Sequence, residues 1–359
     1  MAKSKGEKLR RILFQRPESY EEVLTSILAV PLSLGVAFVF LWAMKYDPLP
    51  ALKYLLQGMA GSRLNLMRTL EKTTPLLLTG LCVAFAFRAG LFNIGGEGQL
   101  YLGAMAAAIV GYSIAPPAFI HVPLALFAAG LVGGIWSAIP GALKARVGAH
   151  EVIITIMMNY IAILFTSYLA SGPLKEPGEY QWVDKTRDIH SSAELFRFSP
   201  KSLLSGAIIV ALICAIIMHL ILTKTKLGYE IRATGLNPKA AEYGGISVSR
   251  NIILAMFISG IFAGVGGGGE VLGTYGYFIT GFSRGLGFDG IAVAVLGRNT
   301  AIGTILAALL FGALKSGGVE MQMRAGVPIE MIFVVQAIII LVVAAPQIIR
   351  IIFMLKKEE

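Results

Sequence analysis

We predict an all-α, polytopic membrane protein of about ten transmembrane helices, some of them broken or re-entrant, from three observations. Of the 359 residues, 56% are apolar and only 14% are charged, whereas a typical globular domain carries about 25% charged residues. The mean hydropathy is +0.73. Apolar runs also recur along the chain, and about 20 apolar residues cross a bilayer as a helix. These observations argue against a soluble globular protein.

The first 22 residues form a basic tail, and an apolar run at 23–44 follows it. This run is too long for the core of a signal peptide, and no typical cleavage site comes after it. We therefore expect an uncleaved first span and a tail that stays in the cytoplasm.

Nine further spans are predicted, and together with the first they make a single transmembrane domain over residues 23–355. They are 74–88, 96–114, 121–143, 152–170, 202–223, 251–270, 287–297, 301–315 and 329–349. Because the run at 287–297 is too short to cross as a straight helix, we expect the region 271–297 to be broken or re-entrant.

Alternation of the spans places the short connections that carry Arg88, Lys144 and Arg298 in the cytoplasm. Basic residues favour that side, so both termini are predicted to be cytoplasmic. The loop at 171–201 then lies outside the cell, and the loop at 224–250 lies in the cytoplasm.

Small residues are spaced for helix packing within the membrane. Gly260, Gly264 and Gly268 recur every four residues on one face, and Gly130 and Gly134 repeat the spacing. Such faces allow helices to approach closely. A formal G-x-G-x-x-G within this region is not a dinucleotide site, because no strand precedes it.

The segment 88–103 places Asn93, Glu97 and Gln99 among five glycines, between two apolar runs. Polar groups on irregular backbone at membrane depth are tolerated where they line a cavity or are buried in protein. The alternative is a short cytoplasmic turn in which Glu97 interacts with the dipole of the next helix. The residues alone leave both interpretations open.

Several other site classes are absent from the sequence. No P-loop motif occurs, so any ATPase must be a separate chain. His150 and Glu151 begin a zinc motif, but Ile154 replaces its second histidine. We therefore predict no metal site, no catalytic residues and no enzymatic activity. The net charge of +10 is assigned to span ends and lipid rather than to nucleic acid.

Four motifs resemble the permease subunits of ABC importers for nucleosides and simple sugars, in the group that also includes ribose and branched-chain amino acid permeases. They are GLFNIGGEGQLYLGAMAA at 90–107, HEVIITIMMNYIA at 150–162, LGYEIRATGLNPKAAEYGGIS at 227–247 and GFDGIAVAVLGRN at 287–299. The residues of the first two motifs resemble the nucleoside branch more closely than the ribose branch.

This resemblance implies a fold similar to that of the cobalamin importer and a location in the bacterial plasma membrane. It implies two permease subunits, identical or different, above ATPase domains that bind ATP and Mg. It also implies an extracytoplasmic substrate-binding lipoprotein. This chain would form the pathway for nucleosides or related simple sugars and would itself bind no cofactor.

The third motif is expected to form the coupling segment that contacts the ATPase. Asn237 can cap a short helix that begins at Pro238 and is stopped by glycines, and such a helix fits a groove of a partner. The alternative is a solvated loop. The candidate coupling residues are Gly235, Asn237, Pro238, Ala241, Glu242 and Gly245.

Polar or aromatic residues in or near the spans are candidates for the solute pathway. They are Phe92, Asn93, Glu97, Gln99, Thr155, Asn159 and Asp289. For Thr155 and Asn159 the alternative is hydrogen bonding between helices. Aromatic residues near Glu270 and Asp289 could stack on a base or form an interfacial belt, and Trp182 could anchor a partner protein or lie in a solvated loop.

Two other functions compete with an ABC permease. An ion-driven secondary transporter also uses intramembrane carboxylates and broken helices, but it does not need a coupling segment. A membrane-embedded enzyme is disfavoured because the sequence shows no catalytic constellation.

Overall fold

The computed structural model describes residues 35–36, 38–178, 182–328 and 330–344. The chain divides into two compact units, residues 56–317 and residues 1–55 with 318–359, and each is described by itself. In these described ranges the chain is helical, contains no strand, and has six helices long and apolar enough to cross a membrane. Ten spans and the cobalamin-importer fold remain predictions. The basic tail and most of the first predicted span lie outside the described residues.

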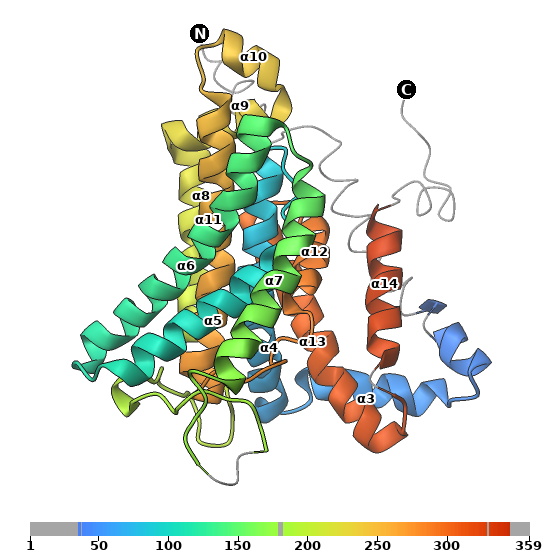
Figure 1. Ribbon diagram of the computed structural model, residues 1–359. Helices are drawn as coiled ribbons and strands as arrows, with labels where there is room; N and C mark the ends of the chain where they lie inside the picture. Colours follow the sequence, from blue (N-terminus) through green and yellow to red (C-terminus); the bar gives the residue numbers. More distant parts are fainter. Residues whose placement is uncertain (1–34, 37, 179–181, 329, 345–359) are drawn as a thin grey trace, which may run out of the picture. The chain divides into compact units, whose positions relative to one another are not determined.

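Most helices follow one another with short connections, and a long connection joins α7 to α8 (Figure 1). Their bounds are α3 Pro48–Ala60, α4 Arg63–Arg88, α5 Gly96–Ser113, α6 Ala118–Val147, α7 Glu151–Ser171, α8 Ala207–Lys224, α9 Lys226–Leu236, α10 Pro238–Tyr243, α11 Val248–Glu270, α12 Leu286–Leu296, α13 Ala301–Ala325 and α14 Glu330–Ala344, with the short helices η1 Ser191–Ala193 and η2 Val271–Tyr275.

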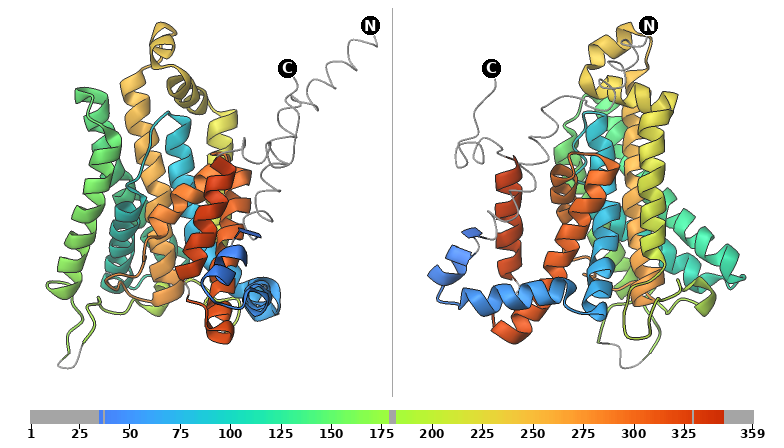
Figure 2. Two further views of the ribbon diagram at one scale, coloured as in Figure 1. Left: turned by 90° about the vertical axis from the view of Figure 1, so that its right-hand side faces the viewer. Right: turned by 180° about the vertical axis from the view of Figure 1, so that it is seen from behind.

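Helix α11 lies at the centre of the larger unit, where it packs against α4, α5 and α6. The close approach depends on glycine, as the sequence predicts. A Cβ atom at Gly133 would lie 2.6 Å from the Gly260 carbonyl oxygen, and one at Gly134 would lie 3.0 Å from the Phe257 carbonyl oxygen. Backbones in contact gain dispersion energy that larger side chains would prevent. The long connection between α7 and α8 lies at the end of this unit opposite α10 (Figure 2).

At three places within the described residues, the helix bounds differ from the predicted spans by five residues or more. Helix α4 begins at Arg63 rather than 74 because Ser62 caps its N-terminus: Ser62 Oγ accepts the Asn65 N–H at 3.1 Å. Helix α13 continues to Ala325 rather than 315, past Lys315. Helix α8 begins at Ala207 rather than 202 because Gly206 N–H bonds to the Phe196 carbonyl oxygen at 2.9 Å.

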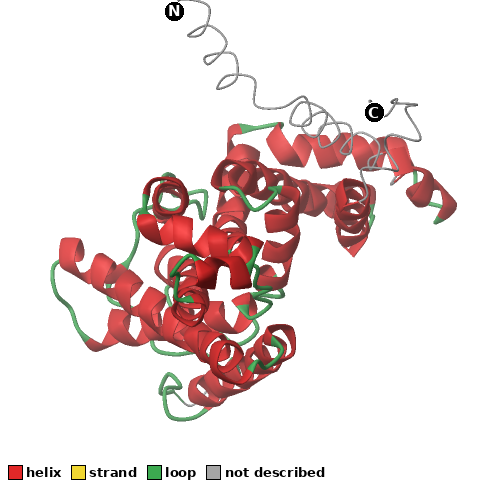
Figure 3. Cartoon of the chain, turned by 90° about the horizontal axis from the view of Figure 1, so that it is seen from above, coloured by secondary structure: helices red, strands yellow, loops and turns green. Residues whose placement is uncertain are grey.

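The predicted break between 271 and 297 is present. Helix α11 continues into the π-helical turn η2, which Gly276 ends with a φ of +79°. An irregular connection leads to α12, whose 11 residues span only about 16 Å. Viewed from above, helices joined by loops account for the described chain (Figure 3).

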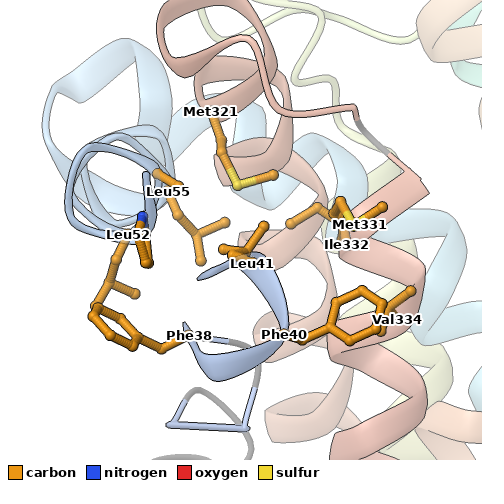
Figure 4. Close-up of a pocket in the computed structure, with 11 residues that line it drawn as sticks. Phe38, Phe40, Leu41, Leu52, Leu55, Met321, Met331, Ile332 and Val334 are labelled. Carbon is orange, nitrogen blue, oxygen red and sulfur yellow. The ribbon is translucent and has the colours of Figure 1, made fainter. Parts of the chain in front are cut away.

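In the smaller unit, the first residues of α3 face α14 and the end of α13 across a small apolar cavity (Figure 4). Its wall includes Leu41, Leu55, Met321 and Ile332. The sequence did not predict α3, although Asp47 caps it: Asp47 Oδ1 accepts the N–H of Leu49 at 3.1 Å.

Candidate functional site

A buried polar network joins the turn before α5 to three helices. Asn93 is fully buried, and its Nδ2 donates to Ser259 Oγ on α11 at 2.8 Å. The amides of Asn93 and Gln99 bond reciprocally, at 3.1 and 3.2 Å. Ser259 Oγ donates to the Cys82 carbonyl oxygen on α4 at 2.7 Å. The network therefore fixes the turn against α4, α5 and α11.

Helix α7 supplies the next contact to the same turn. Asn159 Oδ1 accepts the Gly98 N–H at 2.8 Å, and Asn159 Nδ2 donates to the Ile94 carbonyl oxygen at 2.9 Å. Thr155 is buried too, but its hydroxyl bonds to the Glu151 carbonyl oxygen of its own helix at 2.8 Å. Asn159 thus makes the interhelical bonds considered for it from sequence, while Thr155 does not.

Glu97 lies in the first turn of α5, yet its carboxylate caps a different helix. It accepts the backbone N–H groups of Gly285 at 3.1 Å and Gly287 at 2.6 Å, at the start of α12. A helix N-terminus has free N–H groups and a positive dipole end, so a carboxylate there is stabilised. From the sequence, one interpretation was that Glu97 interacts with the dipole of α5, but the N–H groups that its carboxylate accepts belong to α12.

The aromatic residues after η2 pack against one another and against α5. Phe282 lies 4.8 Å from Tyr101, 5.7 Å from Phe278 and 6.0 Å from Tyr275, measured between ring centroids. Phe278 and Tyr101 are buried. Phe92 lies apart from this cluster and stacks on Phe87 at 5.0 Å. Most of these rings therefore lie in a packed core in this conformation.

Asp289 is separate from the buried network. It forms an ion pair with Lys315 of α13 at 2.6 Å, and both side chains are about one-fifth exposed. Lys315 was not among the predicted site residues because the span was predicted to end at 315. A charge within an apolar helix was the available signal, because such residues face a partner or a wet cavity.

A second group of charges lies between α4 and the end of α11. Lys72 Nζ contacts Glu71 Oε1 at 3.0 Å, and Glu270 lies within electrostatic range of both. Glu270 is 9% exposed and has no hydrogen bond or ion pair among the described residues. Only Glu270 of these three was noted from the sequence. The adjacent opposite charges of Glu71 and Lys72 in the sequence were the signal that could have indicated this group.

The predicted coupling segment has the expected local structure. Asn237 Oδ1 accepts the Ala240 N–H at 3.1 Å, which caps α10, and Pro238 takes its first position. Gly245, with a φ of +78°, adopts a conformation that other residues avoid. Ala241 is buried, whereas Leu236 and Tyr243 are 89% and 96% exposed. A cleft lined by both α9 and α10 opens beside these residues.

The coupling segment also contacts the turn that carries the first motif. A Cβ atom at Gly90 would lie 3.1 Å from the carbonyl oxygen of Gly235, and one at Gly235 would lie 2.8 Å from the Gly90 nitrogen. Because neither glycine has a side chain, the end of α9 touches the α4–α5 connection directly.

The long connection between α7 and α8 is organised by ion pairs around Lys185. Lys185 Nζ contacts Glu176 at 2.8 Å and Asp188 at 3.1 Å. Burial acts to lower the pKa of Lys185, but the hydrogen bonds to these carboxylates outweigh it and the pKa is raised. Trp182 is 94% exposed, so the connection presents a large aromatic side chain to its surroundings.

Within the described part of the chain, no three His, Cys, Asp or Glu residues are grouped so that they could hold a metal ion. The described residues form polar contacts that position the helices and two groups of charges within apolar helices. They also form the exposed short helix α10 at one end of the larger unit.

Comparison with known proteins identifies the family to which this chain belongs. Residues 65–344 match the model of the branched-chain amino acid transport system permease component. The guanosine ABC transporter permease protein NupP of Bacillus subtilis is 47% identical, over 91% of this chain and 94% of that protein. The nucleoside ABC transporter permease protein NupB of Lactococcus lactis is 36% identical, over 92% and 93%. The glucose ABC transporter permease protein TsgB13 of Haloferax volcanii is 34% identical, over 88% and 86%.

No solved structure matches the chain significantly. The family match covers most of the sequence, including all four motifs, and the similar proteins are matched over nearly their full length. The chain therefore belongs to the family of permease components of the branched-chain amino acid transport system.

Proposed function

We propose that this chain is the membrane-spanning permease subunit of an ATP-driven importer and that its solutes are nucleosides. The relative with 47% identity is named for guanosine and the one with 36% for nucleosides, whereas the glucose relative has 34%. Both solute types carry hydroxyl groups, so simple sugars are the nearest alternative solutes.

The observation that carries the proposal is the exposed short helix α10. Tyr243 at its end and Leu236 just before it are almost fully exposed. Large apolar side chains exposed together are typical of a docking surface. The direct contact of Gly235 with Gly90 offers a route from that surface into the helices, which can then move as rigid bodies.

Within the pathway we assign two different roles. Asn93, Gln99 and Asn159 are buried and bonded to other protein groups, so they position the elements around the route. Asp289 and Lys315 are partly exposed within apolar helices. A charge pair there is costly against lipid, so this pair lies on the wet side, where a solute passes.

The proposed assembly contains further chains. A separate ATPase binds ATP and Mg below α10, because no P-loop occurs in this sequence. A second permease subunit, the same chain or a different one, completes the pathway, and an extracytoplasmic lipoprotein delivers the solute near Trp182. The protein is placed in the bacterial plasma membrane with both termini in the cytoplasm, and it catalyses no reaction itself.

A second candidate is an ion-driven carrier, which the cluster of Glu71, Lys72 and Glu270 favours. A buried carboxylate without a hydrogen bond resembles the ion and proton sites of secondary transporters. An ion-driven carrier would not need α10 or its exposed residues.

Affinity purification from native membranes separates the two candidates. We expect the tagged chain to retain a stoichiometric P-loop ATPase after gentle extraction, identified by mass spectrometry. Isolation without any ATPase, from membranes that still transport the solute, would support the ion-driven carrier.

A further inference from the structure

A basic cavity lies at the end of the larger unit that carries α9 and α10. Its volume is about 420 Å³. The ends of α4, α8, α9 and α13 meet there. Its lining includes Arg88, His219, Arg232, Thr300 and Ile302.

The positive charge of this cavity is not neutralised by the described protein. Neither Arg88 nor Arg232 forms an ion pair with a carboxylate in the described ranges. Arg88 Nε donates to the carbonyl oxygen of Asn299 at 2.7 Å, and Arg232 Nε donates to that of Gly228 at 3.3 Å. Each guanidinium keeps further N–H donors, and the two repel each other across the cavity.

Exposed apolar side chains adjoin the cavity on two helices. On α13, Ile302 is 66% exposed, and Leu306 one turn further is 62% exposed. On α8, Leu212 and Ile216 are exposed on the face that carries His219. Seen from behind, α8 and α13 lie on either side of α4 (Figure 2). The helices α8 and α13 therefore each extend an apolar surface from the basic cavity.

We propose that this cavity binds the phosphate group of an anionic phospholipid, whose acyl chains lie along α8 and α13. Arginines suit a phosphate because their planar N–H groups bond to its oxygens. Basic pockets between membrane helices on the cytoplasmic side are suited to anionic headgroups. A soluble phosphate ester would use the same arginines, but it would leave the apolar surfaces unused. The inference concerns lipid and is independent of the solute proposed above.

The test measures lipid binding by the full-length chain, with any partners that co-purify, in nanodiscs of phosphatidylcholine with and without phosphatidylglycerol. Native mass spectrometry counts the lipids that remain bound after release. Phosphatidylglycerol should remain bound in preference to phosphatidylcholine. Arg232→Gln should weaken that binding about fivefold, which corresponds to about 1 kcal/mol for one arginine near the surface.

The matched control is Arg250→Gln, because Arg250 is exposed on α11 and does not line the cavity. Thermal unfolding of both variants checks that they remain folded. Ile302→Glu, which places a like charge in the path of the lipid, should also weaken retention of phosphatidylglycerol.

Three outcomes would overturn the proposal. One is equal retention of the two lipids by the unchanged protein. Another is an Arg250→Gln effect as large as that of Arg232→Gln. The third is displacement of the bound phosphatidylglycerol by inorganic phosphate or guanosine monophosphate, which would show that the arginines serve a soluble phosphate.

Discussion

The Glu97 carboxylate accepts the backbone N–H of Gly287 at 2.6 Å, although the two residues are 190 positions apart in the chain. This bond joins the start of α5 to the start of α12 and so connects the first and last of the four motifs. A Cβ atom at Gly287 would lie 2.7 Å from the Gly96 carbonyl carbon, so only glycine allows the approach.

Glu97→Gln should destabilise the protein by about 1.5–3 kcal/mol, the usual contribution of a hydrogen bond to a charged group. The amide keeps the shape of the side chain but loses the negative charge that stabilises the N-terminus of α12. Thermal unfolding of the purified chain in detergent measures the effect.

Glu194→Gln is the control, because Glu194 is an exposed carboxylate of the α7–α8 connection. It should leave the unfolding temperature unchanged. Equal unfolding temperatures for Glu97→Gln and the unchanged protein would refute the capping role of Glu97.

Asn93→Ala should also lower stability, by about 1–3 kcal/mol for each buried polar group left without a partner. Gln99, Ser259 and the N–H of Gly95 all bond to the Asn93 side chain. Thermal unfolding and uptake are measured together, with Gln57→Ala at an exposed position as the control. Loss of uptake with unchanged stability would mean that Asn93 contacts the solute rather than positioning the turn.

Gly103→Val should prevent correct folding, because a side chain at this position would collide with the backbone of Gly264 on α11. We expect a loss of monodisperse protein in size-exclusion chromatography. Gly96→Ala is the matched control: its nearest neighbour would be 3.6 Å away. Normal expression and elution of Gly103→Val would contradict the close packing of α5 and α11.

Tyr243→Ala should weaken the association with the ATPase at least tenfold, since exposed aromatic anchors commonly contribute 2 kcal/mol or more to an interface. Glu242→Lys should lower solute-stimulated ATP hydrolysis by reversing a charge on the same helix. Trp182→Ala, at the opposite end, should leave ATPase retention unchanged. Retention of the ATPase by Tyr243→Ala and by a Leu236→Ala variant would remove α10 from the interface.

Much of the helical pattern was predictable from hydropathy, because apolar runs and glycine spacing reflect burial and close packing directly. The boundaries were less predictable. Helix α4 begins eleven residues before its predicted start because Ser62 caps it, with Ser62 Oγ accepting the Asn65 N–H at 3.1 Å, and hydropathy does not detect a cap. Helix α3 was missed because its apolar residues occupy only part of its surface.

The local structure of the candidate residues was predictable from the sequence, whereas their contacts with distant helices were not. The α10 cap by Asn237 follows from local sequence and was confirmed. The capping of α12 by Glu97 and the pairing of Asp289 with Lys315 join helices distant in the sequence. Local patterns contain no information about which distant helix supplies the partner. Whether these residues line the pathway remains a prediction.

The most direct test of the account is uptake of radiolabelled guanosine by cells that produce or lack this chain, with ATP and the ion gradients depleted separately. We predict uptake that requires the chain and ATP, persists when an ionophore collapses the gradients, and is lost in the Tyr243→Ala variant. Uptake that survives ATP depletion but stops with the ionophore would contradict an ATP-driven importer.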